Sequence, residues 1–102
     1  MKRNAILLNQ ADNVATALAA LAAGVEAVAE LDGDESRVVL LNDIPLAHKY
    51  ALREIPEGAR VVKYGLPIGT ATRRIRAGEW VHDHNVMSDF IGEMAKKYGR
   101  RS

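Results

Sequence analysis

Short apolar blocks separated by polar turns run along most of the chain and favour a fold built mainly from β-strands. The apolar run at 5–8 predicts a short buried strand. Residues 25–31 and 37–41 predict two more strands, and Asp32-Gly33-Asp34 between them is typical of a hairpin turn. Residues 42–53 follow no regular pattern.

Two segments instead predict helices. The alanine-rich segment from Asp12, a helix N-cap residue, to Gly24, a residue typical of the position after a helix, favours the first helix. Its larger apolar residues recur at helical spacing and are Val14, Leu18 and Leu21. Ser88 is expected to cap a second helix. The expected fold class is therefore α+β, mostly β with one or two helices, with one domain at 1–87 and a helical extension at 88–102.

A segment of the chain occurs twice. Residues 51–61 return as residues 71–81, and both copies share an isoleucine, then a glycine and then a valine. The identical pairs are Ala51/Ala71, Arg53/Arg73, Ile55/Ile75, Gly58/Gly78 and Val61/Val81. This pattern predicts two similar β units, each with an apolar anchor, a tight turn at glycine and a strand. Tyr64–Gly69, between the copies, predicts another turn and the start of a strand.

Composition narrows the classes of function. The 102 residues include 14 basic and 13 acidic side chains, a net charge of +1, which argues against nucleic acid as the main partner. The absence of cysteine excludes disulfides and thiolate metal sites. The apolar run near the N-terminus is too short for a signal peptide or a membrane span. We therefore expect a cytoplasmic protein with no membrane partner.

Two polar clusters are candidates for chemistry. If the strand at Val81 continues, His82 and His84 lie side by side on one face, where they could bind a transition metal or act as a general base. Asn85 would then present its amide to substrate hydroxyls. His48 and Lys49 form the second cluster and suit a carboxylate, because both donate hydrogen bonds. The alternative for both clusters is an exposed, solvated loop or strand end.

Other polar and aromatic residues have simpler structural explanations. Asp12 and Asn13 are explained by helix capping, and Trp80 and Tyr64 by packing. An arginine group could attract an anionic substrate, although a solvated strand face is the better explanation; its members are Arg73, Arg74 and Arg76.

Several of these segments together resemble a known family. Four stretches, in the same order, are similar to the N-terminal module of altronate and galactarate dehydratases, which belongs to the SAF group with its β-clip fold. They are Asp12 to Leu18, Asn42 to Ile55, Val62 to Gly69 and Ala77 to Asn85. One departure is Ala47, which stands before His48-Lys49 where the family commonly has glycine.

The resemblance implies a lyase that removes water from a sugar acid to give a 2-keto-3-deoxy acid, with Fe²⁺ or a similar divalent metal. A separate large dehydratase subunit would hold most of the metal site and the sugar-acid substrate. In that reading His82 and His84 are catalytic and metal ligands, while His48, Lys49 and Asn85 bind substrate. The same module resembles the small subunit of sulfolactate sulfo-lyase, which is one alternative. A non-catalytic binding or structural SAF module is the other.

Overall fold

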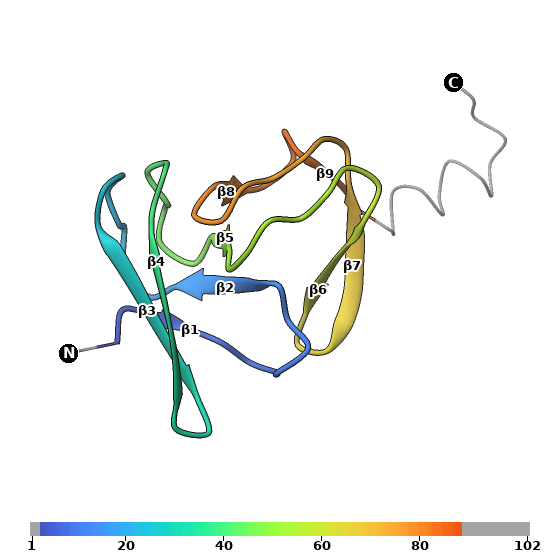
Figure 1. Cartoon of the computed structure of the whole chain (residues 1–102). Coiled ribbons are helices and arrows are strands. Elements are labelled where there is room, and N and C mark those ends of the chain that lie inside the picture. Colours follow the sequence, from blue (N-terminus) through green and yellow to red (C-terminus); the bar gives the residue numbers. More distant parts are fainter. Residues whose placement is uncertain (1–2, 89–102) are drawn as a thin grey trace, which may run out of the picture.

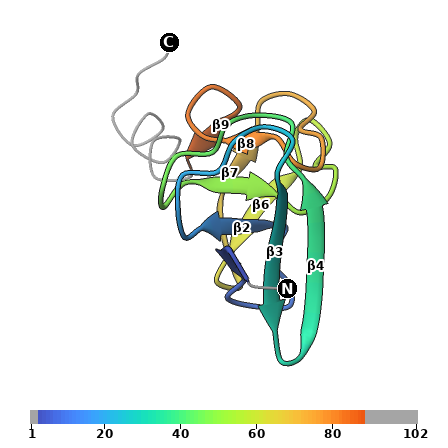
Figure 2. The ribbon, with the colours of Figure 1, turned by 90° about the vertical axis from the view of Figure 1, so that its left-hand side faces the viewer.

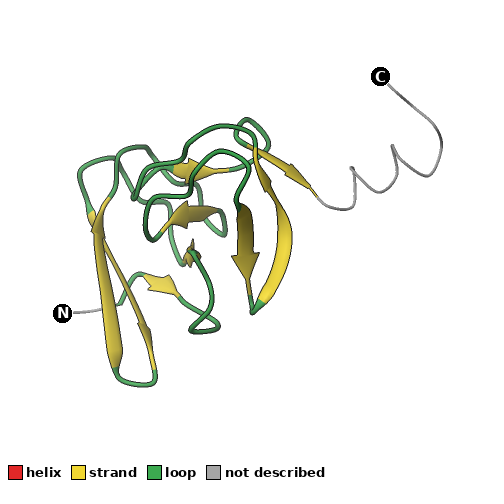
Figure 3. Cartoon of the chain, turned by 45° about the vertical axis from the view of Figure 1, so that its right-hand side comes forward, coloured by secondary structure: helices red, strands yellow, loops and turns green. Residues whose placement is uncertain are grey.

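The structure, a computed structural model, describes residues 3–88, and within this range it consists of strands and loops with no helix (Figure 3). The strands are β1 (Ala5–Ile6), β2 (Val14–Ala17), β3 (Glu26–Leu31), β4 (Asp34–Val39), β5 (Lys49–Ala51), β6 (Arg60–Lys63), β7 (Leu66–Ala71), β8 (Trp80–Val81) and β9 (Val86–Ser88). The mostly β prediction is confirmed. The second predicted helix, from Ser88 onward, lies outside the described residues.

The strands form two sheets (Figure 1). One has the order β4-β3-β1-β2-β5-β8 and the other β6-β7-β9. Neighbours pair antiparallel except β1 and β3, which are parallel. The long β3–β4 hairpin extends from one side of the molecule, and the β6–β7 hairpin lies on the other (Figures 1 and 2). No helix in the described part of the chain is long and apolar enough to cross a membrane.

Both hairpins turn through residues with positive φ, as tight type I′ turns require. Asp32 and Gly33 have φ of 53° and 87°, and Tyr64 and Gly65 have φ of 58° and 76°. These are the two turns that the sequence predicted. The strand expected at 37–41 begins earlier, at Asp34. The turn has only two residues, so pairing with β3 starts directly after it, with Asp34 opposite Leu31.

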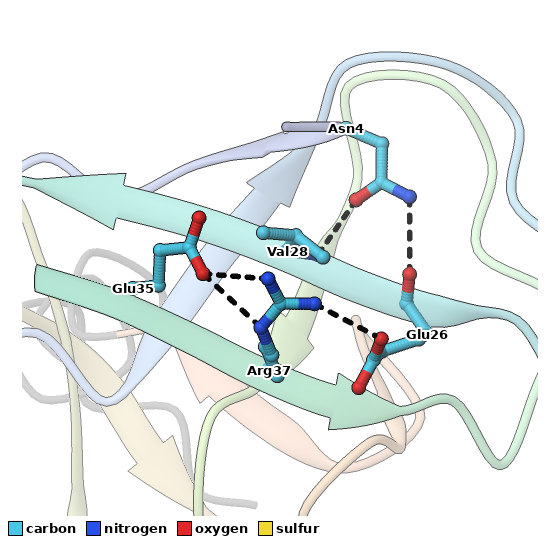
Figure 4. A network of polar contacts seen from close by, with 5 residues as sticks. All are labelled: Asn4, Glu26, Val28, Glu35 and Arg37. Atoms are coloured by element: carbon cyan, nitrogen blue, oxygen red, sulfur yellow. Dashed lines mark hydrogen bonds and ion pairs between the residues drawn. The ribbon is translucent and has the colours of Figure 1, made fainter. Parts of the chain in front are cut away.

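Polar contacts stabilise the β3–β4 hairpin, whose outer strand β4 is an edge of the sheet (Figure 4). Arg37 forms ion pairs with Glu26 at 3.3 Å and with Glu35 at 2.7 Å. The Asn4 amide donates to the Glu26 carbonyl and accepts from the Val28 N–H, so it ties the start of the chain to β3. Charged side chains on an edge strand also discourage pairing with another chain.

One local unit, which we call a hook, occurs at four places in the described chain. A hook starts at a buried residue, carries an aliphatic residue in an isolated β-bridge, turns at a residue with positive φ and ends at another buried residue. The hooks cover 17–27, 40–50, 51–61 and 71–81. The last two are the repeat found in the sequence. The first two lack enough identity to be recognised from sequence.

The hooks associate in two pairs, each with reciprocal backbone hydrogen bonds. Leu21 and Ile44 exchange both N–H···O bonds in the first pair, at 2.9 and 2.7 Å. Ile55 and Ile75 do so in the second, both at 2.8 Å. The residue with positive φ in each hook donates its N–H to the first residue of the partner hook. This exchange gives each pair an approximate twofold relation, and it confirms the two similar β units predicted from the repeat.

Ala47 occupies the position that glycine fills in the other hooks. Its φ is 70°, compared with 91°, 85° and 89° for Gly24, Gly58 and Gly78. An alanine in this region costs about 1–2 kcal/mol relative to ordinary backbone. The turn nevertheless keeps the same hydrogen bond, from the Ala47 N–H to the Ala17 carbonyl at 3.0 Å. Alanine in place of glycine therefore leaves the turn before His48 with the same path as the turns of the other three hooks.

Each pair of hooks surrounds its own apolar cluster. The first cluster is rich in alanine around the buried ring of Tyr50, and its members are Ala5, Ala15, Ala17, Ala27, Ala29, Leu40, Ile44 and Tyr50. The second is mainly β-branched, with Val14, Ala51, Ile55, Val61, Ala71, Ile75 and Val81. β2 contributes to both clusters, because Val14 faces one and Ala15 the other.

The helix predicted from Asp12 to Gly24 is wrong. Residues 14–17 form β2 between β1 and β5, and Gly24 is the turning residue of the first hook. Alanine has a high helix propensity, but propensity is weak beside tertiary pairing. The small side chains of Ala15 and Ala17 instead let the strands close around Tyr50.

Asp12 therefore has a different role from the predicted N-cap. Its buried carboxylate accepts hydrogen bonds from the backbone N–H groups of Tyr64 and Gly65, at 2.9 and 2.8 Å. The Asn13 side chain likewise bonds the Arg60 carbonyl and the Val62 N–H. Together they fix the β6–β7 hairpin against the start of β2.

Gly78 tests how tightly the two halves of the molecule are joined. A Cβ at Gly78 would lie 2.4 Å from the Val39 carbonyl oxygen, whereas a Cβ at Gly58 would meet nothing within 4 Å. Both residues have a similar positive φ. We expect Gly58→Ala to cost about 1 kcal/mol and Gly78→Ala to cost more than about 3 kcal/mol, because backbone must move. Urea denaturation measures both; equal losses would contradict the close approach.

The Tyr50 hydroxyl is buried with no hydrogen-bond partner among the described residues, and burial raises the pKa of Tyr50 from 10.0 to about 12. We expect Tyr50→Phe to stabilise the protein by about 1 kcal/mol, since it removes an unsatisfied group. In the parent, the folded state holds this proton more tightly, so stability should fall as pH rises from 10 to 12. Denaturation across this range should show a smaller fall in the variant, with exposed Tyr64→Phe as the control.

Candidate functional site

Trp80 is the centre of the cluster that holds all three histidines of the chain. Trp80 is the first residue of β8, at the end of the fourth hook. It pairs with Tyr50 of β5, and Val81 pairs with Lys49. The Asn42 side chain accepts a hydrogen bond from the Trp80 backbone N–H at 2.9 Å. The indole Nε1–H donates to His48 Nδ1 at 3.1 Å, so a neutral His48 carries its proton on Nε2.

The imidazole rings gather around this indole. His82 stacks on Trp80 with ring centroids 5.3 Å apart and an interplanar angle of 9°. The His84 centroid is 5.0 Å from that of Trp80, and the His48 centroid is 4.6 Å from that of His82. The first pair of hooks thus supplies His48, the second pair supplies Trp80, and the turn after the fourth hook supplies His82 and His84. Their meeting brings the two clusters predicted from sequence, His48-Lys49 and His82-His84, into one region.

The predicted strand carrying both His82 and His84 is not present. β8 ends at Val81, and a turn follows, closed by hydrogen bonds from the Asn85 and Val86 N–H groups to the His82 carbonyl. Asn85 is fully buried; its Oδ1 accepts from the His82 N–H and its Nδ2 donates to the Trp80 carbonyl. Both ends of the amide are therefore engaged with backbone. The structure gives Asn85 a positioning role in place of the expected contact with substrate hydroxyls.

The two histidines of this turn line different hollows. His82, half-buried, borders a hollow of about 130 Å³ together with Lys49, Asp83 and Ser88. His84, exposed, borders a wider cleft of about 600 Å³ together with Trp80. Neither ring is enclosed in the apolar interior. The structure brings Lys49 to His82 and places His84 in the neighbouring cleft.

Lys49 is the site residue with a clear electrostatic perturbation. Burial lowers the pKa of Lys49, and the nearby charge of Lys63 lowers the pKa further, while Asp83 opposes both. A partly buried ammonium with a second cation nearby lacks full compensation. An anionic group placed in the small hollow would supply it, so the site suits a carboxylate.

The described residues do not fit a metal centre of their own. No group of three or more His, Asp or Glu side chains between residues 3 and 88 is placed to hold a metal ion. His82 and His84, the predicted ligands, border separate hollows. Two imidazoles also fall short of the three or four protein ligands usual for a catalytic or structural metal.

Sequence reasoning missed Trp80 and Asn42 as parts of this site. Its sequence context predicts packing for Trp80, and nothing in that context shows which ring it contacts. Asn42 lies 38 positions from Trp80, and only the fold brings them together. The available signal was their presence in the stretches that resemble the dehydratase module.

The fold and site together define a β module built from hooks, in which three histidines gather around one tryptophan and Lys49 lies beside His82. Comparison with known proteins gives the family: residues 3–89 match the altronate/galactarate dehydratase SAF domain. This chain belongs to that family.

Its relatives include both long and short proteins. The chain is 46% identical over 84 residues to altronate dehydratase of Escherichia coli (strain K12), covering 82% of this chain and 16% of that enzyme. It is 36% identical to altronate dehydratase of Bacillus subtilis (strain 168), with the same coverage. It is also 42% identical over 69 residues to (2R)-sulfolactate sulfo-lyase subunit alpha of Chromohalobacter salexigens, covering 62% of this chain and 73% of that subunit. The chain thus spans about one sixth of the dehydratases it matches.

The hydrogen bond from Trp80 to His48 makes a prediction about the imidazole proton. We expect His48 in the parent to be mainly the Nε2–H tautomer, because Nδ1 accepts from the indole. Trp80→Phe keeps an aromatic ring but removes the donor, and we expect a mixture of both tautomers. The ¹⁵N chemical shifts of the imidazole nitrogens measure this. His84, which contacts the indole without such a bond, is the internal control; an unchanged His48 would contradict the assignment.

Proposed function

We propose that this chain is the small SAF-domain part of a sugar-acid dehydratase of the altronate type, and that a larger polypeptide completes the active site. The observation that carries the proposal is the meeting of Lys49 with His82, next to His48, at an open hollow. Membership of the dehydratase SAF family supports the reaction class. The altronate dehydratases that the chain matches are about six times longer than the matched region, and in this proposal the remainder belongs to the larger polypeptide.

Dehydration of a 2,3-dihydroxy acid needs a base for the proton next to the carboxylate and help for the departing 3-hydroxyl. The imidazole of His82, which borders the hollow, is suited to move that proton. The Lys49 ammonium, which borders the hollow, is suited to hold the carboxylate, and the Nε2–H of His48, whose ring lies 4.6 Å from that of His82, is a second donor close by. Binding the anion also compensates the partly buried Lys49 charge. Trp80 and Asn85 position these groups.

A divalent metal, Fe²⁺ in this proposal, would be held mainly by the larger polypeptide. When bound there, the metal would act as a Lewis acid on the substrate carboxylate or hydroxyl. The described residues of this chain would add at most the imidazole of His82, because His84 borders the other cleft. Cytoplasmic location and assembly into a hetero-oligomer are parts of the same proposal.

The second candidate is the small subunit of a sulfolactate sulfo-lyase, which would eliminate sulfite in place of water. The observation in its favour is length, because the match covers 73% of one such alpha subunit and 81% of another, from Paracoccus pantotrophus. Both candidates place the same residues beside a small carboxylate-bearing substrate. A non-catalytic sugar-acid-binding or structural module is the third.

The experiment reconstitutes the chain with the larger polypeptide that co-purifies with it and measures product from altronate, galactarate and sulfolactate. We expect keto-acid formation from a sugar acid, and His82→Ala to lower kcat by about 10²-fold or more, as expected for loss of a general base. Lys49→Gln should mainly raise KM.

His84→Ala is the matched control, because that ring borders the other cleft. Full activity in the His82→Ala/His84→Ala double variant would remove both histidines from the reaction. Sulfite release from sulfolactate alone would select the second candidate.

A further inference from the structure

The wider cleft beside Trp80 has no role in the proposed reaction, yet its lining has the chemistry of a binding site. Its volume is about 600 Å³, and its polar walls come from both pairs of hooks. Asn42 and Asp43 belong to the second hook, while Arg73, Arg76 and His84 belong to the fourth hook or follow it. The cleft therefore exists only where the two halves meet.

The two carboxylates of this cleft are already occupied. Asp43 Oδ1 accepts a hydrogen bond from the Ala23 N–H at 2.9 Å. Glu79 Oε2 accepts from the Arg76 N–H at 3.2 Å, and its Oε1 lies 4.0 Å from Arg73 Nη2. Both acids thus stabilise backbone turns of the hooks, which reduces their availability to a cation entering the cleft.

The hydrogen-bond donors that line the cleft have fewer partners than its carboxylates. The Arg76 guanidinium has no ion pair among the described residues. Arg73 has a side chain that is 56% exposed, and its contact with Glu79 is at the outer limit for an ion pair, so it contributes little. Asn42 uses its oxygen for the Trp80 N–H, which leaves its NH₂ group as a donor. By contrast, Arg74 points to Glu54, with 2.7 Å between Nε and Oε2, and does not line the cleft.

We propose that this cleft is a second ligand site, which binds the carboxylate of a small polyhydroxy acid through Arg76. Arg73 assists, because guanidinium groups match carboxylates in geometry. Asn42 and His84 donate or accept hydrogen bonds with the hydroxyls, and the indole of Trp80 forms one wall. The choice of a sugar acid as ligand rests on the proposed function, but the site requires neither a partner chain nor turnover.

The chain carries its own reporter for this binding, since Trp80 is its single tryptophan. The full-length chain is titrated with galactarate, and the Trp80 indole N–H signal is followed by ¹H–¹⁵N NMR. Galactitol, which has the same carbon chain without carboxylates, is the matched ligand control. We expect a saturable shift with galactarate and none with galactitol.

The variants separate this cleft from the smaller hollow. Arg76→Gln should weaken galactarate binding about tenfold or more, as expected for the loss of a charge-assisted hydrogen bond. Arg74→Gln, which removes an equal charge outside the cleft, should leave the affinity unchanged. Lys49→Gln, which removes the donor of the other hollow, should lower the galactarate affinity less than Arg76→Gln does.

Three results would overturn the inference. They are the absence of any saturable shift, equal affinities of Arg76→Gln and the parent, and loss of binding in Lys49→Gln in place of Arg76→Gln. The last result would keep the proposed reaction site and reject this one. A lowered affinity for the larger polypeptide in Arg76→Gln, without any effect on galactarate, would make the cleft a protein contact. Galactarate binding without lyase activity would reject the proposed function alone.

Discussion

The close approach of Gly78 to the end of β4 is the contact on which the rest of the molecule depends. Gly78 donates its N–H to the Ala51 carbonyl, and its own carbonyl accepts from the Leu41 N–H. It therefore belongs to both pairs of hooks at once, and a side chain there would collide with the Val39 carbonyl. The next turn of chain carries Trp80 to Asn42. Together with the pairing of Lys49 with Val81 between β5 and β8, this contact brings His48 and His82 close to each other.

Many polar residues that look suited to a ligand instead hold the backbone. Asp12 fixes the β6–β7 turn, Asn42 fixes Trp80, and Asn85 fixes the turn of His82. Asp12 and Asn85 are buried, and a buried polar group is costly unless it is hydrogen-bonded. Irregular segments between short strands have few backbone–backbone hydrogen bonds. Side-chain amides and carboxylates therefore bond the backbone groups that would otherwise lack a partner. The groups left to face solvent at the clefts are then imidazoles, lysines and arginines.

In the proposed function, the module is a platform beside an active site that a larger polypeptide completes. Its strands are short, and its two apolar clusters are joined mainly through β2 and β5. Positions within such a platform are set by backbone hydrogen bonds more than by bulky packing. The hooks thus fix where His48, Lys49 and His82 stand, while the chain offers no complete metal site among its described residues. This combination is consistent with a domain that contributes groups to a site shared with a larger polypeptide.

The sequence by itself determined the mostly β class, both tight turns, the repeat of 51–61 at 71–81, the family and the two polar clusters. Each of these depends on neighbouring residues or on a matching order of motifs. Only the tertiary structure decided that Ala15 and Ala17 lie in a strand and not in a helix, because pairing with β1 and β5 outweighs the local preference of alanine. It also decided that Trp80 joins the histidines and that His82 and His84 face different hollows. Those outcomes depend on contacts between residues far apart in the chain, which no local pattern records.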